Sequence, residues 1–135
     1  MIVVDSNILA YLWLPGSATE TAKSVWERDN EWHVPVLWRS ELRNILVGYL
    51  RRGVLDYEAI KSVMQLMEET LHSREHLVQS NVILLLARNS HCSAYDCEFV
   101  ALAETLSVPL ITEDKLILKA FPRLAQSMKT FINAG

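Results

Sequence analysis

Four acidic residues, Asp5, Glu41, Asp96 and Asp114, have the side chains and the positions to form a carboxylate cluster. Asp5 and Asp114 each follow a short apolar stretch and open a segment with helical spacing. Glu41 falls in the first turns of one predicted helix, and Asp96 falls at the start of another. If the apolar stretches are parallel strands, their carboxyl ends share the sheet edge where ligands commonly bind. All four carboxylates could then project from that edge.

Taken singly, each acid also has a purely structural explanation. Asp5 could be a helix N-cap, and Asp114 an early-helix acid. Glu41 could be a solvated residue that is favoured by the helix dipole. Asp96 completes a capping-box spacing with Ser93. The signal for chemistry therefore comes from the combination of the four acids.

The elements that must position these acids are predicted from apolar periodicity. Strands are expected at 2–4, 32–35, 108–111 and, last in the chain, 128–132. A first helix is expected to begin after 5–7 and to end before 15, and a second to follow the capping-box spacing at 17–20 and to end at about 28. Further helices are expected at 37–50, 57–71, 80–89 and 95–106, and a short one after 114. The helix at 80–89 is expected to be mostly buried, and 72–79 fits either a loop or a short strand. Strands that alternate with helices predict a single domain over 1–135, a three-layer α/β/α sandwich around a small, mostly parallel sheet.

Composition narrows the function classes. The chain has 135 residues, a formal net charge of −3 and 50% hydrophobic residues, which excludes disorder as its main state. Its longest apolar run, 82–87, is far too short to span a membrane, and no export signal opens the sequence, so the cytoplasm is expected. Cys92 and Cys97 are expected to be reduced structural thiols.

Four stretches around the acids together resemble the PIN-domain nucleases. They read VVDSN at 3–7, SELRN at 40–44, AYDCEFVALAE at 94–104 and PLITED at 109–114. The likeness is strongest to the small VapC-like toxins of VapBC toxin–antitoxin pairs. It implies an endoribonuclease toxin, a cognate antitoxin partner and a homodimer.

The resemblance also implies a site. Asp5, Glu41, Asp96 and Asp114 would be the catalytic acids and would hold one or two Mg²⁺ or Mn²⁺ ions, while Asn7 and Thr112 would support them. One departure is that Lys115-Leu116-Ile117 follows Asp114, so an additional downstream acid of some relatives is absent, whereas Glu113 adds a carboxylate.

Elementary chemistry agrees with a metal at such a cluster. Neighbouring carboxylates raise one another's pKa, and the ionised set needs a compensating cation. Ligands that are all oxygen select hard ions such as Mg²⁺ or Mn²⁺, and a retained water can become the nucleophile of phosphodiester hydrolysis. Ser6 and Asn7, at a helix N-terminus, could offer N–H groups to a phosphate.

The sequence pI of about 5.8 argues against broad electrostatic adhesion to RNA. Local attraction could come from a set of basic side chains near the acids, although a solvated helix face explains them equally well. They are Arg39, Arg43, Arg51, Arg52 and Lys115.

Two alternatives to the nuclease stay open. One is a PIN-fold module that binds RNA or protein without cutting. The other is a phospho-acceptor signalling domain, for which Asp56 is the only mid-chain candidate; it follows a predicted helix end rather than a strand. The four histidines have no metal-ligand spacing and receive no role.

Overall fold

A parallel sheet forms the centre of the protein. The computed structural model describes residues 1–134, and in this range five short strands pair in the order β3-β2-β1-β4-β5, every pair parallel. The strands are β1 (Ile2–Val4), β2 (Trp32–Pro35), β3 (Glu75–His76), β4 (Leu110–Ile111) and β5 (Ala125–Gln126). All three residues of β1 are buried, as expected of a β-branched strand that is covered on both faces.

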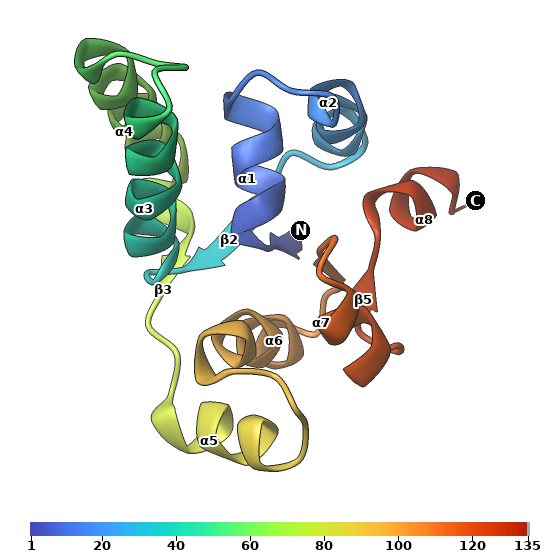
Figure 1. Ribbon diagram of the computed structural model, residues 1–135. Coiled ribbons are helices and arrows are strands. Elements are labelled where there is room, and N and C mark those ends of the chain that lie inside the picture. The colour runs from blue at the N-terminus through green and yellow to red at the C-terminus, as the bar shows by residue number, and fades with distance from the viewer. Residues whose placement is uncertain (135) are drawn as a thin grey trace.

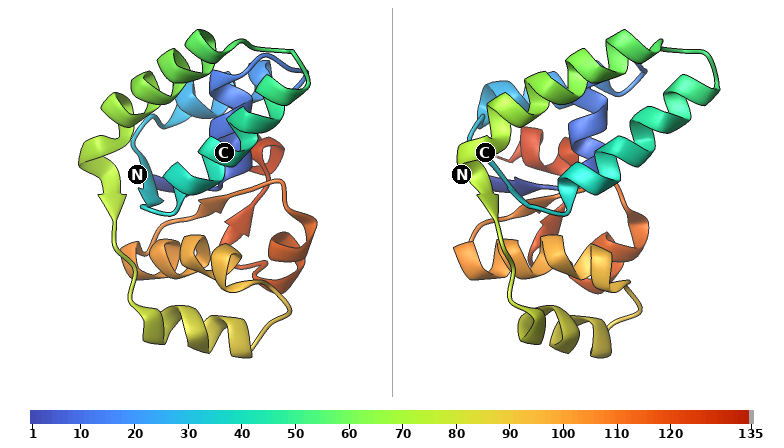
Figure 2. Two further views of the ribbon diagram at one scale, coloured as in Figure 1. Left: turned by 60° about the vertical axis from the view of Figure 1, so that its left-hand side comes forward. Right: turned by 90° about the vertical axis from the view of Figure 1, so that its left-hand side faces the viewer.

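Helices cover both faces of this sheet (Figure 1). One layer holds α1 (Ser6–Trp13), α2 (Thr19–Arg28), α3 (Trp38–Arg51), α4 (Tyr57–Leu71) and α8 (Met128–Asn133). The other face is covered by α6 (Ala94–Leu106), with α5 (Ser80–Arg88) packed on its outer side. A 3₁₀ turn at His72–Arg74 precedes β3, and α7 (Lys115–Ala120) follows β4. The predicted α/β/α sandwich is confirmed, and Figure 2 shows the same layers from two further sides.

The prediction of a last strand at 128–132 was wrong. This segment is α8, and the strand of the region is β5, a few residues earlier. The helix is favoured by its N-terminus, where the Ser127 side chain accepts from the backbone N–H of Thr130 at 3.1 Å. The Glu113 carboxylate also accepts from the N–H of Met128 at 2.8 Å. Capping from a distant loop is invisible to a reading of local periodicity.

The expected burial of the helix at 80–89 was also wrong. No residue of α5 is buried, and Leu84 and Leu85 are exposed. The reason is its place in the fold, because α6 lies between α5 and the sheet (Figure 2). The ambiguous segment 72–79 contains the 3₁₀ turn and β3.

No helix in residues 1–134 is long and apolar enough to cross a membrane.

Candidate acidic site

Asp5 lies at the carboxyl end of β1, the central strand of the sheet, and caps α1. Its Oδ1 accepts from the backbone N–H of Ser6 at 2.8 Å, and its Oδ2 accepts from the Thr112 hydroxyl at 2.7 Å. Thr112 follows β4, the strand beside β1, and is fully buried. Adjacent parallel strands therefore bring together two residues that are 107 positions apart in the chain.

Burial changes the acidity of Asp5. Only 8% of the residue is exposed, and desolvation raises the pKa of its carboxyl group to about 6. The hydrogen bonds from Thr112 and Ser6 oppose this rise in pKa, whereas the nearby charges of Glu41 and Asp96 add to it. The carboxylate is thus stabilised by dipoles but has no positive charge among these causes.

Ser6 connects Asp5 to Glu41. The Ser6 hydroxyl donates to Glu41 Oε1 at 2.8 Å, while its backbone N–H donates to Asp5. Glu41 is half-buried in the first turn of α3, and burial followed by the charge of Asp96 raises its pKa. One serine at the start of α1 therefore fixes two of the predicted acids.

Asp96 is the third residue of α6 and forms a capping box with Ser93. The Ser93 hydroxyl accepts from the Asp96 N–H at 3.0 Å, and the Asp96 carboxylate accepts from the Ser93 N–H at 3.4 Å. Asp96 is close enough to raise the pKa of both Asp5 and Glu41. The structure thus brings three of the four predicted acids into one electrostatic cluster.

Asp114 is joined to the cluster through Thr112. Its backbone N–H donates to the Thr112 hydroxyl at 3.0 Å, and that hydroxyl donates to Asp5. The Asp114 carboxylate caps α7, where it accepts from the N–H groups of Leu116 and Ile117.

The side chains do not form a closed metal cage. Within residues 1–134, no group of three or more His, Cys, Asp or Glu side chains has the geometry to hold a metal ion. In the same range, none of the four acids has a Lys, Arg or His nitrogen within the 4.0 Å of an ion pair. Asn7, next to Ser6 in α1, keeps a buried Oδ1 that has no hydrogen-bond partner there. Uncompensated carboxylates and an unpartnered oxygen are a donor set that fits a hard cation.

Four further residues lie close to the acids but were missed from the sequence. Burial raises the pKa of Tyr11, with Glu113 and Asp5 adding to the effect, and Glu98 has its pKa raised by burial and by Glu41. Tyr95 and Asn44 line a cavity beside Glu41. The spacing of Asn44, three residues after Glu41 on a predicted helix, was the one available signal.

Comparison with known proteins identifies the family. A model of the PIN domain matches residues 2–124. This chain belongs to the PIN domain family. A ribonuclease named VapC3 from Pyrobaculum aerophilum is 28% identical over 128 residues, covering 91% of this chain and 96% of that protein.

Solved structures share the PIN fold of this chain at low identity. PAE2754 from Pyrobaculum aerophilum gives a TM-score of 0.76 at 18% identity, over 97% of this chain and 92% of that chain. FitAcB from Neisseria gonorrhoeae gives a TM-score of 0.72 at 15% identity, over 96% of this chain and 99% of that chain. A toxin–antitoxin complex from Klebsiella pneumoniae gives a TM-score of 0.70 at 16% identity, over 95% of this chain and 98% of that chain. These likenesses show the fold.

The five basic residues predicted to lie near the acids differ in their contacts. Arg39 is held by Glu75, whose carboxylate accepts at 2.6 and 2.7 Å, and it also pairs with Glu68. Its guanidinium therefore ties α3 to α4 and β3, a structural role that differs from the solvated helix face considered above. Arg52 lies over the Tyr49 ring at 4.8 Å. Arg43, Arg51 and Lys115 are exposed, and their contact with RNA stays a prediction.

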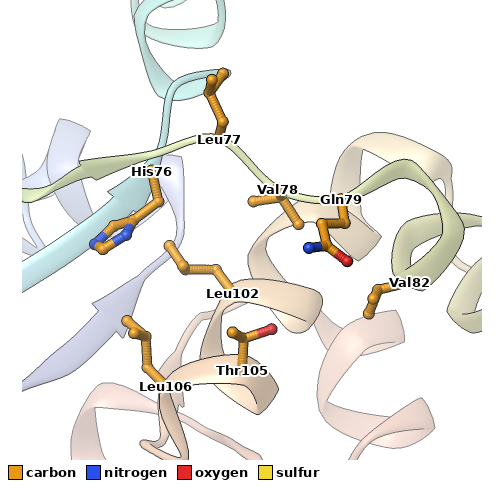
Figure 3. A pocket seen from close by; sticks show the side chains of 8 residues that line it. All are labelled: His76, Leu77, Val78, Gln79, Val82, Leu102, Thr105 and Leu106. Carbon is orange, nitrogen blue, oxygen red and sulfur yellow. The ribbon is translucent and has the colours of Figure 1, made fainter.

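A second cavity of the PIN domain, about 200 Å³, contains none of the four acids (Figure 3). It lies where the segment after β3 passes over α6, and side chains such as Val78, Leu102 and Leu106 line it. His76 at its edge shares a hydrogen bond of 2.8 Å with His33.

Asp56, the phospho-acceptor candidate, caps α4 instead of ending a strand.

Proposed function

We propose that this PIN domain is a metal-dependent endoribonuclease and the toxin of a toxin–antitoxin pair. The observation that carries the proposal is the uncompensated acidic cluster at the carboxyl end of the central strand. Asp5 and Glu41 share Ser6, Asp96 acts on both electrostatically, and no basic side chain among residues 1–134 pairs with them. Neighbouring carboxylates, of which Asp5 is buried and Glu41 half-buried, are costly to ionise without a cation, so a function that supplies one is favoured.

The metal would be Mg²⁺ or Mn²⁺, with Asp5, Glu41, Asp96 and Asp114 as its candidate ligands. Mg²⁺ typically keeps several waters and takes only one or two direct carboxylates, so it does not require a closed cage of side chains. The free Oδ1 of Asn7 supports the same assignment. When bound, such an ion lowers the pKa of its water and neutralises charge on a phosphoryl group. Whether one or two ions bind would follow from a titration.

The residues of this chain would hold the acids in place. Thr112 and the Ser6 N–H fix the two oxygens of Asp5, and the Ser6 hydroxyl fixes Glu41. The capping box fixes the start of α6, and therefore the backbone of Asp96. Acids that are fixed before the substrate arrives lose little entropy during the reaction.

The partners follow from the relatives. One relative is named a ribonuclease, and one solved structure of the same fold is a toxin–antitoxin complex. We therefore propose RNA as the substrate and a cognate antitoxin as the inhibitor, and we keep the homodimer that the resemblance to VapC-like toxins implies as the proposed assembly. Size-exclusion chromatography with light scattering would determine the last of these.

Cleavage of RNA with and without Mn²⁺ tests the function. We expect purified protein to fragment total RNA in Mn²⁺ and not in a chelator, and Asp5→Asn and Asp96→Asn to abolish cleavage while they retain the fold by circular dichroism. Asp56→Asn is a matched control, because Asp56 is also a helix N-cap acid, on α4. Glu41→Gln should lower cleavage as well, and Glu20→Gln is its matched control, since Glu20 also lies in the first turn of a helix, α2.

The same assay separates a second candidate, a PIN-fold module that binds without cutting. The absence of a closed cage of three acids among residues 1–134 is the observation in its favour. Binding of RNA with no turnover in Mg²⁺ or Mn²⁺ would favour this second candidate. Full cleavage by both well-folded acid variants would overturn the assignment of the reaction to the acidic cluster.

A further inference from the structure

We propose that the cavity beside the acids is a nucleoside subsite in which Tyr95 stacks on the base next to the scissile phosphate. This inference rests on the proposed function, because it assumes that RNA reaches the acidic cluster. It adds a residue and a mode of recognition to that function.

The cavity is continuous with the acidic site. It measures about 340 Å³ and shares two of its lining residues, Ser6 and Glu41, with the hydrogen-bonded cluster. One side is a stripe at helical spacing along α3, in which Ser40, Glu41 and Asn44 lie between Leu37, the N-cap residue, and Ile45. Ligand pockets of small molecules start at roughly 300 Å³, so the cavity has a suitable volume for a nucleoside. A group bound in it would lie beside the reacting phosphate.

The lining suits a base better than a phosphate. Among residues 1–134, no Lys, Arg or His lines the cavity, and the one charged residue in its lining is the acidic Glu41. Leu37 and Ile45 offer apolar surface to the faces of a base. Ser40 and Asn44 offer neutral donors and acceptors to its edge or to a ribose hydroxyl.

Tyr95 provides the stacking surface. It lines the same cavity and is 64% exposed, so its ring is accessible to a ligand bound there. It is the second residue of α6, directly before Asp96, and the capping box of Ser93 and Asp96 fixes its backbone. A tyrosine has only two side-chain torsions, so ordering it against a base costs little entropy. Stacking on an aromatic ring is a general mode of binding single-stranded RNA.

Binding of RNA that carries 2-aminopurine tests the proposal. Rapid mixing with short single-stranded RNAs in Mn²⁺ records the fluorescence change before any cleavage, with the 2-aminopurine placed at each position in turn. We expect one position to be quenched by the wild-type protein. Tyr95→Ala should remove that quench and weaken binding by about 5- to 150-fold, the usual range for one stacked base. Tyr95→Phe and Tyr95→Trp should restore both.

Two controls isolate the stacking interaction. Tyr57→Ala removes a tyrosine that is 59% exposed on α4 and does not line the cavity, and it should bind as the wild type does. An RNA with an abasic ribose at the quenched position should lose the same factor with the wild type and nothing with Tyr95→Ala, because the interaction is already absent. Asn44→Ala should alter the preference among the four bases at that position.

The outcomes also distinguish this inference from the proposed function. Equal affinity of Tyr95→Ala and wild type for every RNA, with cleavage intact, would overturn the subsite and leave the nuclease. Tyr95-dependent quenching without metal-dependent cleavage would support the subsite and remove the nuclease. If Tyr95→Ala weakened only binding of a protein inhibitor, the cavity would be a protein contact and the nucleoside subsite would be wrong.

Discussion

At the scale of single residues, the chemistry of Asp5 is set more by burial than by its acidic neighbours. Desolvation is the largest cause of its raised pKa, and the charges of Glu41 and Asp96 contribute less than the opposing hydrogen bonds from Thr112 and Ser6. The sequence predicted mutual repulsion between acids, because residue types can be read from it. It could not predict how completely β1 and β4 exclude water from Asp5.

This buried carboxyl group makes the metal-free protein less stable as the pH rises. The pKa of Asp5 is about 6 in the fold against an ordinary value of 3.8, so the folded state binds the proton more tightly. The stability that the protonated group contributes is complete below about pH 4 and is lost as the pH rises through 6. Asp5→Asn carries no titrating group. It should therefore gain stability relative to wild type between pH 4 and 7.5, by about 1–3 kcal/mol for a shift of this size.

Urea unfolding in a chelator at pH 4.5 and 7.5 measures this difference. Asp56→Asn supplies the matched comparison, because it makes the same change at an exposed N-cap. If the difference in free energy of unfolding between Asp5→Asn and wild type stayed constant over this pH range, the pKa of Asp5 would not be raised in the fold.

At the scale of elements, helix N-termini position the site. Asp5 caps α1, Asp114 caps α7, and Asp96 belongs to the capping box of α6. Each acid that looked explicable as a cap is a cap, and three of the four still cluster electrostatically. The structural and the chemical explanations of these residues are therefore compatible.

The capping box of α6 should matter both for stability and for the acidic site. Ser93→Ala removes the acceptor for the Asp96 N–H, which typically costs about 1 kcal/mol. It also frees the first turn of α6, so activity should fall by more than the loss of folded protein explains. Ser93→Asp or Ser93→Thr should restore both. Chemical unfolding and RNA cleavage, measured on the same preparations, would reveal the mismatch, and activity that simply follows the folded fraction would argue against a positioning role.

Local patterns gave most of the elements. The spacing of Ile60, Val63, Met64 and Met67 predicted α4 with its observed bounds, Tyr57–Leu71. The errors arose where distant contacts decide. Glu113 caps α8 from another loop, and α6 separates α5 from the core. The same holds at the site, since the positions of the four acids could be chosen from motifs, whereas the cavity between α3 and Tyr95 exists only once the chain is folded.

At the scale of the whole molecule, a cation bound at the acidic cluster, as proposed above, would contribute to the free energy of folding. A ligand that binds only the folded state stabilises it by RT ln(1 + [L]/Kd), which is about 2.7 kcal/mol at a hundredfold excess over Kd. For a domain of this size, each kcal/mol raises the melting temperature by roughly 3–5 °C. Saturating Mn²⁺ should therefore raise the melting temperature of the wild type by about 8–13 °C at pH 7.5.

The size of that shift should depend on the acids and on pH. Asp5→Asn should melt at a higher temperature than the metal-free wild type and respond little to Mn²⁺, because it loses both the buried charge and a ligand. At pH 5, protons compete with the ion for Asp5, whose pKa is about 6, so the wild-type shift should shrink. Glu20→Gln, at an exposed acid of α2, should keep the full response. Calorimetric melting curves with Mn²⁺ and with a chelator give the shift in melting temperature for the wild type at both pH values, for Asp5→Asn and for Glu20→Gln. An equal rise in wild type and Asp5→Asn would place the metal elsewhere on the protein, and the acidic cluster would then need another explanation for its missing counter-charge.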